Sequence, residues 1–581
     1  MNRRSILKSG ISVFSLASGF LPSLAEPSMG AVEEPKSADL WYELSHELGD
    51  RLQPVKWPFA VCLREPDGVA CRTLFQSIRN PFFLSDHPGL TQTSGWVGAW
   101  FAKPSKRVVE AESAEDIAAA IRFARRNGIR LIVKGGGHSY KGCSNAANSL
   151  LVRTRRMKEI TLHDGFVPKH STAEPVPAVS IGSGALWGEV YRTVTVEGGR
   201  YVQGGGCLTV GVAGLVQSGG FGSFSKSYGL AAASLLEAEI VTADGVIRTV
   251  NANQDPELLF ALKGGGGGTF GIVTRLTLQT YDLPATFGAF LLDIRAASDT
   301  SFRALIGQML AFYAETLFGP HWGEQIRFRP DNTLSISMVF QNLTRTEVES
   351  CWAPFFDWVA SRDEYRLISS PTVLAVPARS FWDGEFLRTL PGVVSFDNRP
   401  GANKYNIYWA GNREEAGQVI HAYRSAWLSA DLLDMHQRDQ LADGLLAASR
   451  HWSISLHTNK GLAGASKDVV RAAAETAINP AAIEAFALAI CASEGPPAYP
   501  GVEGHEPDYA RAKQDANHVS SAMAALQEHV VTSGSYLAES DYFEQDWKSA
   551  FWGENYPRLL STKQAYDPEG IFVAHHTVGQ E

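Results

Sequence analysis

The sequence predicts an α+β protein of two or more lobes, and three observations support this prediction. The chain has 581 residues, of which 45% are hydrophobic and 19% charged, and a globular chain of this length exceeds what one hydrophobic core usually holds. Segments with helical and with strand-like patterns are mixed along it. Glycine clusters crowd the part before about residue 285 and become sparse after it. We therefore expect a glycine-rich lobe at 91–285 and a second lobe at 286–530.

Local signals predict the elements of the glycine-rich lobe in order. Residues 113–128 should form a helix, because Ser113 with Asp116 suggests a capping box and Asn127-Gly128 ends the apolar period. The run "IRLIV" (129–133) is typical of a buried strand, and it enters the turn "KGGGHSYKG". Further on, Asp244-Gly245 predicts a hairpin. Asp255-Pro256 predicts the N-cap and first residue of a short helix.

The second lobe and the C-terminal segment carry fewer glycines. "SFRALIGQMLAFYAETL" (301–317) has a helical pattern, and "TLSISMVFQNL" (333–343) has a strand-like one. "GSYLAESDY" (534–542) also reads as a strand, near the start of a C-terminal segment at 531–581. On that reading, alternation would place Glu539 and Asp541 on one face and Tyr536 and Ser540 on the other.

The first 25 residues have the pattern of an export signal. Arg3-Arg4 precede the uncharged apolar stretch 11–25, which ends in the small-x-small pattern Ser23-Leu24-Ala25. A membrane helix is the alternative, but the stretch is marginal for a span and contains Ser, Gly and Pro. Paired arginines are typical of the twin-arginine pathway. We therefore expect a bacterial protein, periplasmic or secreted, with an N-terminal segment at 26–90 and no membrane span in the mature chain.

Charge and cysteine usage limit the other classes. The formal net charge is −9 without a basic run, so nucleic acid is not an expected partner. Six cysteines suit an oxidising compartment, and Cys62 and Cys71 are near enough in sequence to bridge. No CxxC or HExxH pattern occurs, so no metal is expected, and the pair His575-His576 is typical of packed or solvated residues.

Three glycine clusters fall within about 140 residues, and tight turns alone do not explain them. Glycine loops often bind phosphates through backbone N–H groups. The Walker A spacing is absent, and the run at 264–268 follows a helix and enters a strand, the reverse of the order in a Rossmann fingerprint. Several loops that converge on one long ligand fit the pattern better.

Five stretches identify the type of ligand. "KGGGHSYKG", "GGGCLTVGVAGLVQSGGFG", "YGLAAASLLEAEIVTADG", "LFALKGGGGGTFGIVTRL" and "NYPRLLSTKQAYDP" match, in order and spacing, the vanillyl-alcohol oxidase and p-cresol methylhydroxylase (PCMH) superfamily. The chain most resembles its berberine-bridge-enzyme-like oxidases, which include microbial isoamyl-alcohol-oxidase-like proteins. The resemblance implies a two-part FAD-binding domain of the PCMH type at 91–285, an inserted α+β substrate domain at 286–530, and a C-terminal segment that returns to complete the flavin site.

The same resemblance implies the cofactor residues. His138 stands where relatives bond the flavin 8-methyl carbon, and Cys207 where they bond flavin C6, which together imply a bicovalent FAD. The bland alternatives are a structural histidine and a buried thiol. Leu208 and Leu215 depart from the family pattern around Cys207. The other implied cofactor contacts are Gly135, Gly136, Gly137, Ser139, Tyr140, Val210, Gly211, Gly214, Gly219, Gly220, Gly222, Gly271, Ile272 and Asn555.

The implied chemistry is hydride transfer from a substrate to flavin N5, with a base that takes the hydroxyl proton. By resemblance Glu539 is the candidate base, with Tyr536 close by, although a solvated carboxylate is the alternative. His457, Lys460, Tyr405 and Tyr408 are candidate pocket walls. Val210 occupies a place where relatives with a small branched residue admit oxygen.

These expectations describe an oxidase that acts on an alcohol or carbohydrate hydroxyl and reduces O2 to H2O2. Three alternatives stay open at this point: oxidative ring closure on a secondary metabolite, a dehydrogenase with a non-oxygen acceptor, and a catalytically idle flavin-binding protein.

Overall fold

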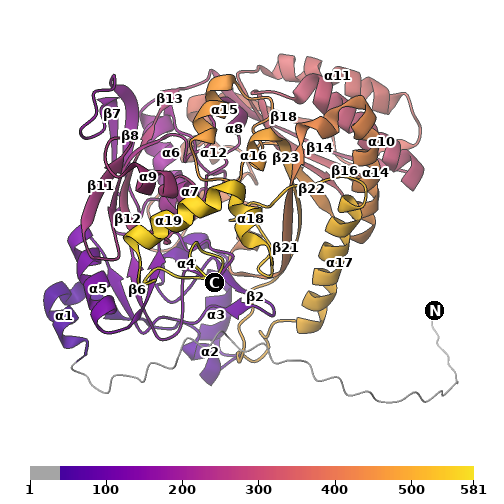
Figure 1. Ribbon diagram of the computed structural model, residues 1–581. Coiled ribbons are helices and arrows are strands. Elements are labelled where there is room, and N and C mark those ends of the chain that lie inside the picture. The colour runs from indigo at the N-terminus through magenta and orange to yellow at the C-terminus, as the bar shows by residue number, and fades with distance from the viewer. Residues whose placement is uncertain (1–39) are drawn as a thin grey trace, which may run out of the picture. The chain divides into compact units, whose positions relative to one another are not determined.

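Five β-sheets organise the part of the chain that the structure, a computed structural model, describes, which is residues 40–581 (Figure 1). The predicted export signal lies outside the described residues. Residues Glu43–Glu581 form one compact unit. In Figure 1, strands β7, β8, β11 and β12 lie on one side of this unit, the large sheet with α10, α11 and α14 lies on the other, and the C-terminal helices α18 and α19 run across the middle of the view.

A four-stranded sheet begins the glycine-rich part. Its order is β1 (Leu52–Pro54), β4 (Arg107–Glu110), β6 (Ser149–Arg153) and β5 (Arg130–Lys134). Helix α5 (Ala114–Arg126) has the predicted capping box, since Ser113 Oγ accepts from the Asp116 amide and Asp116 Oδ2 accepts from the Ser113 amide. β5 pairs in parallel with β6, so the strand ends at Lys134 and delivers the chain directly into the glycine turn. The predicted helix and strand are both confirmed.

A five-stranded antiparallel sheet follows. Its order is β11 (Ile247–Asn251), β10 (Leu235–Val241), β12 (Ile272–Gln279), β8 (Val176–Gly182) and β7 (Ile160–Phe166). The hairpin at Asp244-Gly245 is confirmed, with Gly245 at φ 74°. Helix α9 (Pro256–Leu262) is confirmed too, but its cap is not. Asp255 has φ 52° and no side-chain cap bond, and its carboxylate accepts from the Tyr566 hydroxyl instead.

Short elements connect this sheet to its glycine loops. They are α6 (Trp187–Tyr191), a π-helical turn (Arg192–Glu197), β9 (Arg200–Tyr201), α7 (Val212–Gln217), α8 (Ser225–Tyr228) and β13 (Tyr281–Asp282). β13 pairs with β9. The helices α6 and α7 bury Trp187 and Val216 in one apolar core with residues of the sheet, which fixes the loops that leave them.

The second lobe is built on a ten-stranded sheet. Its strands are β17 (Tyr365–Leu367), β14 (Thr286–Ala296), β16 (Thr333–Gln341), β15 (Trp322–Phe328), β22 (Ile454–His457), β23 (Ala485–Gly495), β21 (Gln418–Ser429), β2 (Thr93–Trp96) and β3 (Trp100–Phe101), with β18 (Thr372–Pro377) paired to β14. β2 and β3 thus join this sheet, although they come from the predicted FAD-binding segment. The strand predicted at 333–343 is confirmed.

Helices cover this sheet through an apolar core around Phe290, Leu445 and Met523. They are α10 (Asp299–Phe312), continued by a π-helical turn (Tyr313–Leu317), α11 (Arg345–Ala360), α14 (Met435–His451) and α17 (Tyr509–Gln527). The helix predicted at 301–317 is confirmed. Smaller helices are α15 (Lys467–Ala474) and α16 (Ala481–Glu484), and two short 3₁₀ turns lie at Ala378–Ser380 and Ala430–Leu433.

An excursion from this lobe forms a small hairpin of its own. β19 (Val394–Phe396) pairs with β20 (Ile407–Trp409), flanked by α12 (Gly384–Leu387) and α13 (Asn412–Glu415). The indole Nε1 of Trp409 donates to the Gly206 carbonyl at 2.7 Å. This bond ties the excursion to the loop that carries Cys207.

The C-terminal segment returns to the glycine-rich part as helices. They are α18 (Trp547–Trp552), a 3₁₀ turn (Gly553–Asn555) and α19 (Tyr556–Tyr566). Lys563, on α19, is buried and donates to the Thr269 carbonyl at 2.7 Å. The strand predicted at 534–542 is wrong. One bridge joins Ser533 to Trp427, and the chain then turns, with the Glu539 amide donating to the Tyr536 carbonyl at 2.9 Å.

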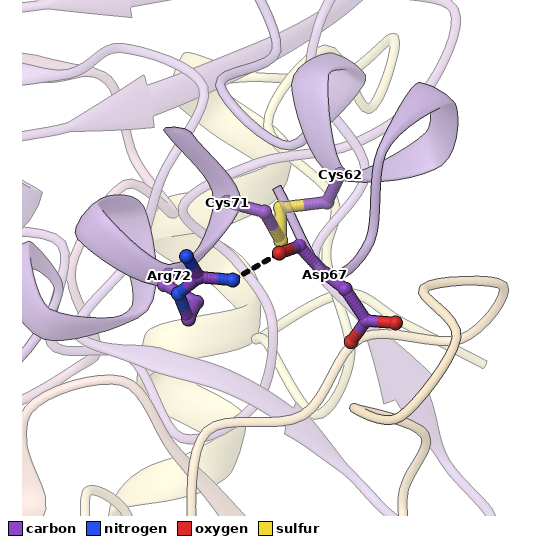
Figure 2. The surroundings of a disulfide bond; sticks show 4 residues. All are labelled: Cys62, Asp67, Cys71 and Arg72. Atoms are coloured by element: carbon purple, nitrogen blue, oxygen red, sulfur yellow. Dashed lines mark hydrogen bonds between the residues drawn. A yellow bond between two sulfur atoms is a disulfide. The ribbon is translucent and has the colours of Figure 1, made fainter. Parts of the chain in front are cut away.

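Short helices lie on either side of β1 near the start of the described chain. They are α1 (Tyr42–Leu48), a 3₁₀ turn (Gly49–Arg51), α2 (Ala60–Arg64), α3 (Val69–Ser77) and α4 (Pro81–Asp86). Figure 2 shows the disulfide between Cys62 and Cys71, which confirms the predicted pairing, and the bond from Arg72 to the Asp67 carbonyl in the loop that it closes. Both sulfurs are buried, so the disulfide joins α2 to α3 within a small apolar core.

Candidate active site

A cavity of about 880 Å³ lies among the glycine loops, the large sheet and the C-terminal segment. Most of the residues predicted to hold the cofactor line it. They are Gly135, Gly136, Gly137, His138, Ser139, Tyr140, Cys207, Val210, Gly211, Gly214, Gly271 and Ile272, and the candidate catalytic residues Tyr536 and Glu539 line it as well. The sequence pattern therefore brings residues more than 400 positions apart to one site.

The two predicted attachment residues are neighbours. Thr209 Oγ1 lies 3.4 Å from His138 Nε2 and 3.5 Å from Cys207 Sγ. Burial lowers the pKa of His138 to about 4, so its imidazole is neutral at pH 7, and burial raises the pKa of the Cys207 thiol. A neutral imidazole has a free lone pair on one ring nitrogen, as bond formation to carbon requires.

Glycine is required where two turns of the cavity wall meet. A Cβ on Gly136 would lie 2.5 Å from the Gly211 nitrogen, and one on Gly211 would lie 2.6 Å from the Gly136 nitrogen. Gly137 has φ 78°, a backbone that side chains disfavour. These three glycines let the turn before His138 cross the turn after Cys207 at backbone contact. The tripeptide before His138 thereby aims the histidine into the cavity.

The polar atoms of the cavity wall fit a dinucleotide. Ser183 Oγ, Gln217 Oε1 and Thr269 Oγ1 line the cavity, are buried, and have no hydrogen-bond partner among residues 40–581. Buried polar groups are seldom left unpaired, so these three atoms suit a ligand with polar groups along its length. A Cβ on Gly214 would meet no protein atom within 4 Å, which leaves room beside α7. These features fit FAD, which carries polar groups along its whole length.

Four predicted cofactor residues do not line the cavity. Gly219, Gly220 and Gly222 serve chain packing: a Cβ on them would lie 2.8 Å from Ile478, 2.7 Å from Ala231 and 2.2 Å from the Gly204 carbonyl. Asn555 faces elsewhere, because its amide donates to the Ile478 carbonyl at 2.8 Å. Sequence spacing located these loops. It could not distinguish glycines that face a ligand from glycines that are needed because another part of the chain packs closely against them.

The predicted pocket walls divide in the same way. His457 and Lys460 line the cavity, whereas Tyr405 is exposed and Tyr408 packs against Phe82. The pair His575-His576 also lines it: His575 stacks on Tyr542, and burial lowers its pKa to about 4. It is a packed pair, as expected.

Tyr536 and Glu539 come to the same cavity although the segment is not a strand. The turn at 536–539, rather than alternation, brings them together. Glu539 forms an ion pair with Lys460, and both side chains are mostly buried. Tyr536 packs against Phe221 and Trp427, and burial raises the pKa of its phenol. Asp541 points away and pairs with Arg424 at 3.1 Å.

The sequence interpretation missed several ionisable and aromatic residues of the cavity wall. They are Glu324, Arg327, Glu415, Tyr423, Glu494 and Trp409, all of which line the cavity. The ring centroids of Tyr140 and Tyr423 are 5.5 Å apart, and burial raises the pKa of both phenols. These residues lie on β15, β21, β23 and the hairpin excursion, and the pairing of those strands has no signature in local sequence. Nothing in the local sequence predicted that the backbone of Glu324 would be left-handed, with φ 74°.

Two family models match the chain in the regions that build this cavity. A model described as FAD binding domain matches residues 105–251, and one described as Berberine and berberine like matches residues 535–579.

Among the described residues, none of the helices has the length and apolar character of a membrane span, and no group of three or more His, Cys, Asp or Glu side chains is arranged to hold a metal ion.

Curated relatives extend over nearly the whole chain. FAD-linked oxidoreductase easE from Arthroderma otae is 30% identical over 94% of this chain and 88% of its own length. Bifunctional decalin synthase calF from Penicillium decumbens is 27% identical over 98% and 96%. Both sources are fungi, so these relatives give no support to the bacterial origin predicted from residues 1–25.

Solved structures share the fold. The VAO-type flavoprotein MtVAO615 from Myceliophthora thermophila C1 has a TM-score of 0.74 at 23% identity, covering 94% of this chain and 95% of its own. A glucooligosaccharide oxidase from Acremonium strictum, described with a 6-S-cysteinyl, 8α-N1-histidyl FAD, has a TM-score of 0.64 at 18% identity, covering 90% and 99%. The glycine-walled cavity, the two family models and the full-length relatives agree: this chain belongs to the berberine-bridge-enzyme-like FAD-linked oxidoreductases, and it shares the fold of the VAO-type flavoproteins.

Proposed function

We propose that the protein oxidises an alcohol or carbohydrate hydroxyl and reduces O2 to H2O2. The observation that carries this proposal is the meeting of His138, Cys207 and the ionisable residues of the C-terminal segment in one cavity. FAD, when bound, supplies the two-electron acceptor for the substrate hydride. The protein's task is then to hold the cofactor, orient the substrate carbon and take its hydroxyl proton.

We propose that His138 and Cys207 both bond the flavin. Support comes from their shared neighbour Thr209 and from the neutral state of the His138 imidazole. The glucooligosaccharide oxidase that shares this fold is described with the same pair of linkages. A tethered cofactor can stay in place beneath an open cavity, which suits a bulky substrate.

The part of the cavity wall that carries Glu415, Glu494, Tyr140 and Tyr423 suits a polar substrate. Glu415 and Glu494 have no ion-pair partner within 4.0 Å among the described residues, and Asn412 donates to Glu415 at 2.8 Å. Burial raises the pKa of Glu415, and Glu494 adds to the effect. Carboxyl groups and the phenols of Tyr140 and Tyr423 offer hydrogen bonds to several hydroxyls at once. Val210, also at the cavity wall, remains our candidate for the residue that admits oxygen.

Oxidative ring closure is the second candidate, because one relative over nearly the whole chain is a decalin synthase.

We also propose export to an oxidising compartment. The Cys62–Cys71 disulfide supports it, since disulfides persist mainly outside the reducing cytosol.

Anaerobic bleaching of the flavin tests the reaction. Holoprotein is mixed with a panel of primary alcohols, mono- and oligosaccharides, and the visible absorbance is followed. Bleaching by a member of the panel, with recovery and peroxide on admission of air, is the expected result. A flavin that stays oxidised with the whole panel would contradict the proposed substrate class, and bleaching without recovery in air would contradict oxygen as acceptor.

A further inference from the structure

Glu324 breaks the alternation of its strand. Trp322, Ile326 and Phe328 of β15 are buried in the core of the second lobe, and a regular strand would point Glu324 into the same core. Its backbone instead has φ 74°, and its side chain lines the cavity beside Gln325. A left-handed conformation is rare for such a residue, and strain of this kind clusters at functional sites.

Contacts from two separate loops hold the carboxylate in this position. The Ser223 hydroxyl donates to Glu324 Oε1, and the Asn459 amide donates to the same oxygen at 3.3 Å. The Thr458 amide donates to the Glu324 carbonyl at 2.9 Å. A Cβ at the preceding Gly323 would lie 1.9 Å from the Ser223 carbonyl, so the strand is pressed against the glycine loop. The surroundings therefore impose the strained backbone and the carboxylate's place together.

The carboxylate lies next to the loop of the predicted attachment cysteine. A Cβ on Gly206 would be 3.8 Å from Glu324 Oε1, and Gly206 directly precedes Cys207. The residue proposed to bond the flavin and the Glu324 carboxylate therefore lie on adjoining parts of the cavity wall.

Glu324 and Glu539 differ in how they interact with Lys460, the nearby cation. Lys460 forms its ion pair with Glu539. Among the described residues Glu324 has no ion-pair partner within 4.0 Å. Burial raises its pKa and the Glu539 charge adds to this, while Ser223 and Lys460 act the other way. The remaining titratable groups that face it are the phenols of Tyr191 and Tyr201.

Two carboxyl groups in one site whose environments differ in this way take different roles. Glu539 is held in the ion pair with Lys460, whereas Glu324 has a raised pKa, no ion-pair partner among the described residues, and a backbone that turns its carboxyl group into the cavity. Tyr536 is poorly suited to accept one, because burial and the nearby Glu539 charge raise the pKa of its phenol. An efficient proton acceptor has a pKa close to the working pH rather than far from it.

We propose that Glu324 is the catalytic residue that accepts the substrate hydroxyl proton, and that the Lys460–Glu539 pair is its fixed electrostatic neighbour. The O–H bond breaks and its proton goes to the Glu324 carboxylate. The carbon gives its hydride to the bound flavin as a two-electron oxidant, and the carbonyl C=O bond forms. The inference rests on the proposed function, because it needs an alcohol as substrate.

The first test needs no substrate. Infrared spectra of the oxidised holoenzyme are recorded across acidic to neutral pH for wild type, Glu324→Gln and Glu539→Gln. The amide oxygen of Gln can accept from Ser223 and Asn459 in place of the carboxylate oxygen Oε1, so the fold should be retained. Because burial raises the pKa of both Glu324 and Glu415, we expect a set of carboxyl bands that titrate above the ordinary Glu range. One of these bands should be missing in Glu324→Gln and present in Glu539→Gln. An unchanged set of bands in Glu324→Gln would overturn the inference.

The second test measures proton acceptance. The rate of anaerobic flavin bleaching is followed against pH with whichever alcohol or sugar of the panel bleaches the wild type. The wild-type rate should rise with pH to a plateau, and Glu324→Gln should be about 100-fold slower or more and lack the rise. Asp541→Asn, a carboxyl outside the cavity, is the matched control and should keep the wild-type profile.

The outcomes separate the two proposals. A Glu324→Gln rate within a few-fold of wild type, with the same pH profile, would overturn the role of Glu324 while leaving the alcohol oxidase intact. A wild type that no panel member bleaches would overturn the proposed function, and the proton transfer with it, even if the infrared titration places a proton on Glu324.

Discussion

Lys460 forms its ion pair with Glu539 and not with Glu324, although the Lys460 charge acts on both carboxyl groups. The pair joins the loop after β22 to the C-terminal segment, two parts of the chain 79 positions apart. With both side chains mostly buried, the pair helps to fix the position of the C-terminal segment at the cavity.

This relationship predicts a strong coupling. Lys460→Met leaves a buried carboxylate without its cation, and Glu539→Gln leaves a buried ammonium without its anion, so each should destabilise the fold by about 3 kcal/mol. The double variant should lose clearly less than the sum, because it strands neither charge. Chemical denaturation of the four proteins measures the cycle, and additive losses would show that the two side chains do not interact.

Glu324 should reveal its backbone strain when its side chain is truncated. Glu324→Ala and Glu324→Gly both remove the carboxylate, but only glycine adopts φ 74° without cost. Glu324→Gly should therefore be the more stable of the two by about 1 kcal/mol, a reversal of the usual order of these residues in a strand. Thermal denaturation of both decides it. A more stable alanine variant would mean that the left-handed conformation is absent.

Lys226 should give the protein a distinctive pH dependence. It is 2% exposed and donates to the carbonyls of Gly461 and Phe486, and burial lowers its pKa from 10.5 to about 7. Between pH 7 and 10.5 the unfolded state binds the extra proton, so this group makes the protein more stable as pH rises and less stable as pH falls.

Lys226→Met should remove about 1.4 kcal/mol per pH unit from the slope of unfolding free energy against pH in that window. The exposed Lys467→Met is the matched control and should leave the slope unchanged. Denaturation series at several pH values measure both. Equal slopes for wild type and Lys226→Met would indicate that the ammonium is charged in the folded state.

Sequence patterns predicted the elements whose signals are local. The capping box at Ser113, the hairpin at Asp244-Gly245 and the turn before His138 all follow from residues within a few positions of each other. The turn at Tyr536 to Glu539 did not, because its apolar and polar order also fits a strand. What decides there is the contact with Trp427, on a distant strand, and with Lys460, on the loop after β22.

The cavity residues show the same division. The glycine loops and His138 could be found by resemblance, since their motifs follow one another in order along one continuous segment. Glu324, Glu415 and Glu494 could not, because three separate parts of the second lobe bring them together and a lone glutamate in a strand or loop has no distinguishing pattern. Asn555 shows the reverse error, since its motif was recognised but its amide is used by Ile478.

Single variants at the attachment residues should separate the two bonds. Cys207→Ala should keep FAD bonded through His138, and His138→Ala should keep it through Cys207 alone, with the larger loss of activity in His138→Ala. The double variant should bind FAD without a bond. Acid precipitation assays this directly, because only bonded flavin stays yellow in the pellet. Yellow colour that remains in the double variant's pellet would place the attachment elsewhere in the chain.

The most direct measurement is the intact mass of the acid-denatured wild-type chain. A bicovalent FAD predicts one species heavier than the polypeptide by a single FAD, less the hydrogens lost on forming two bonds, and peptide mapping should find the flavin joined to both the His138 and Cys207 peptides. A chain at the mass of the bare polypeptide, with all the flavin in the supernatant, would contradict the attachment that organises this account of the site.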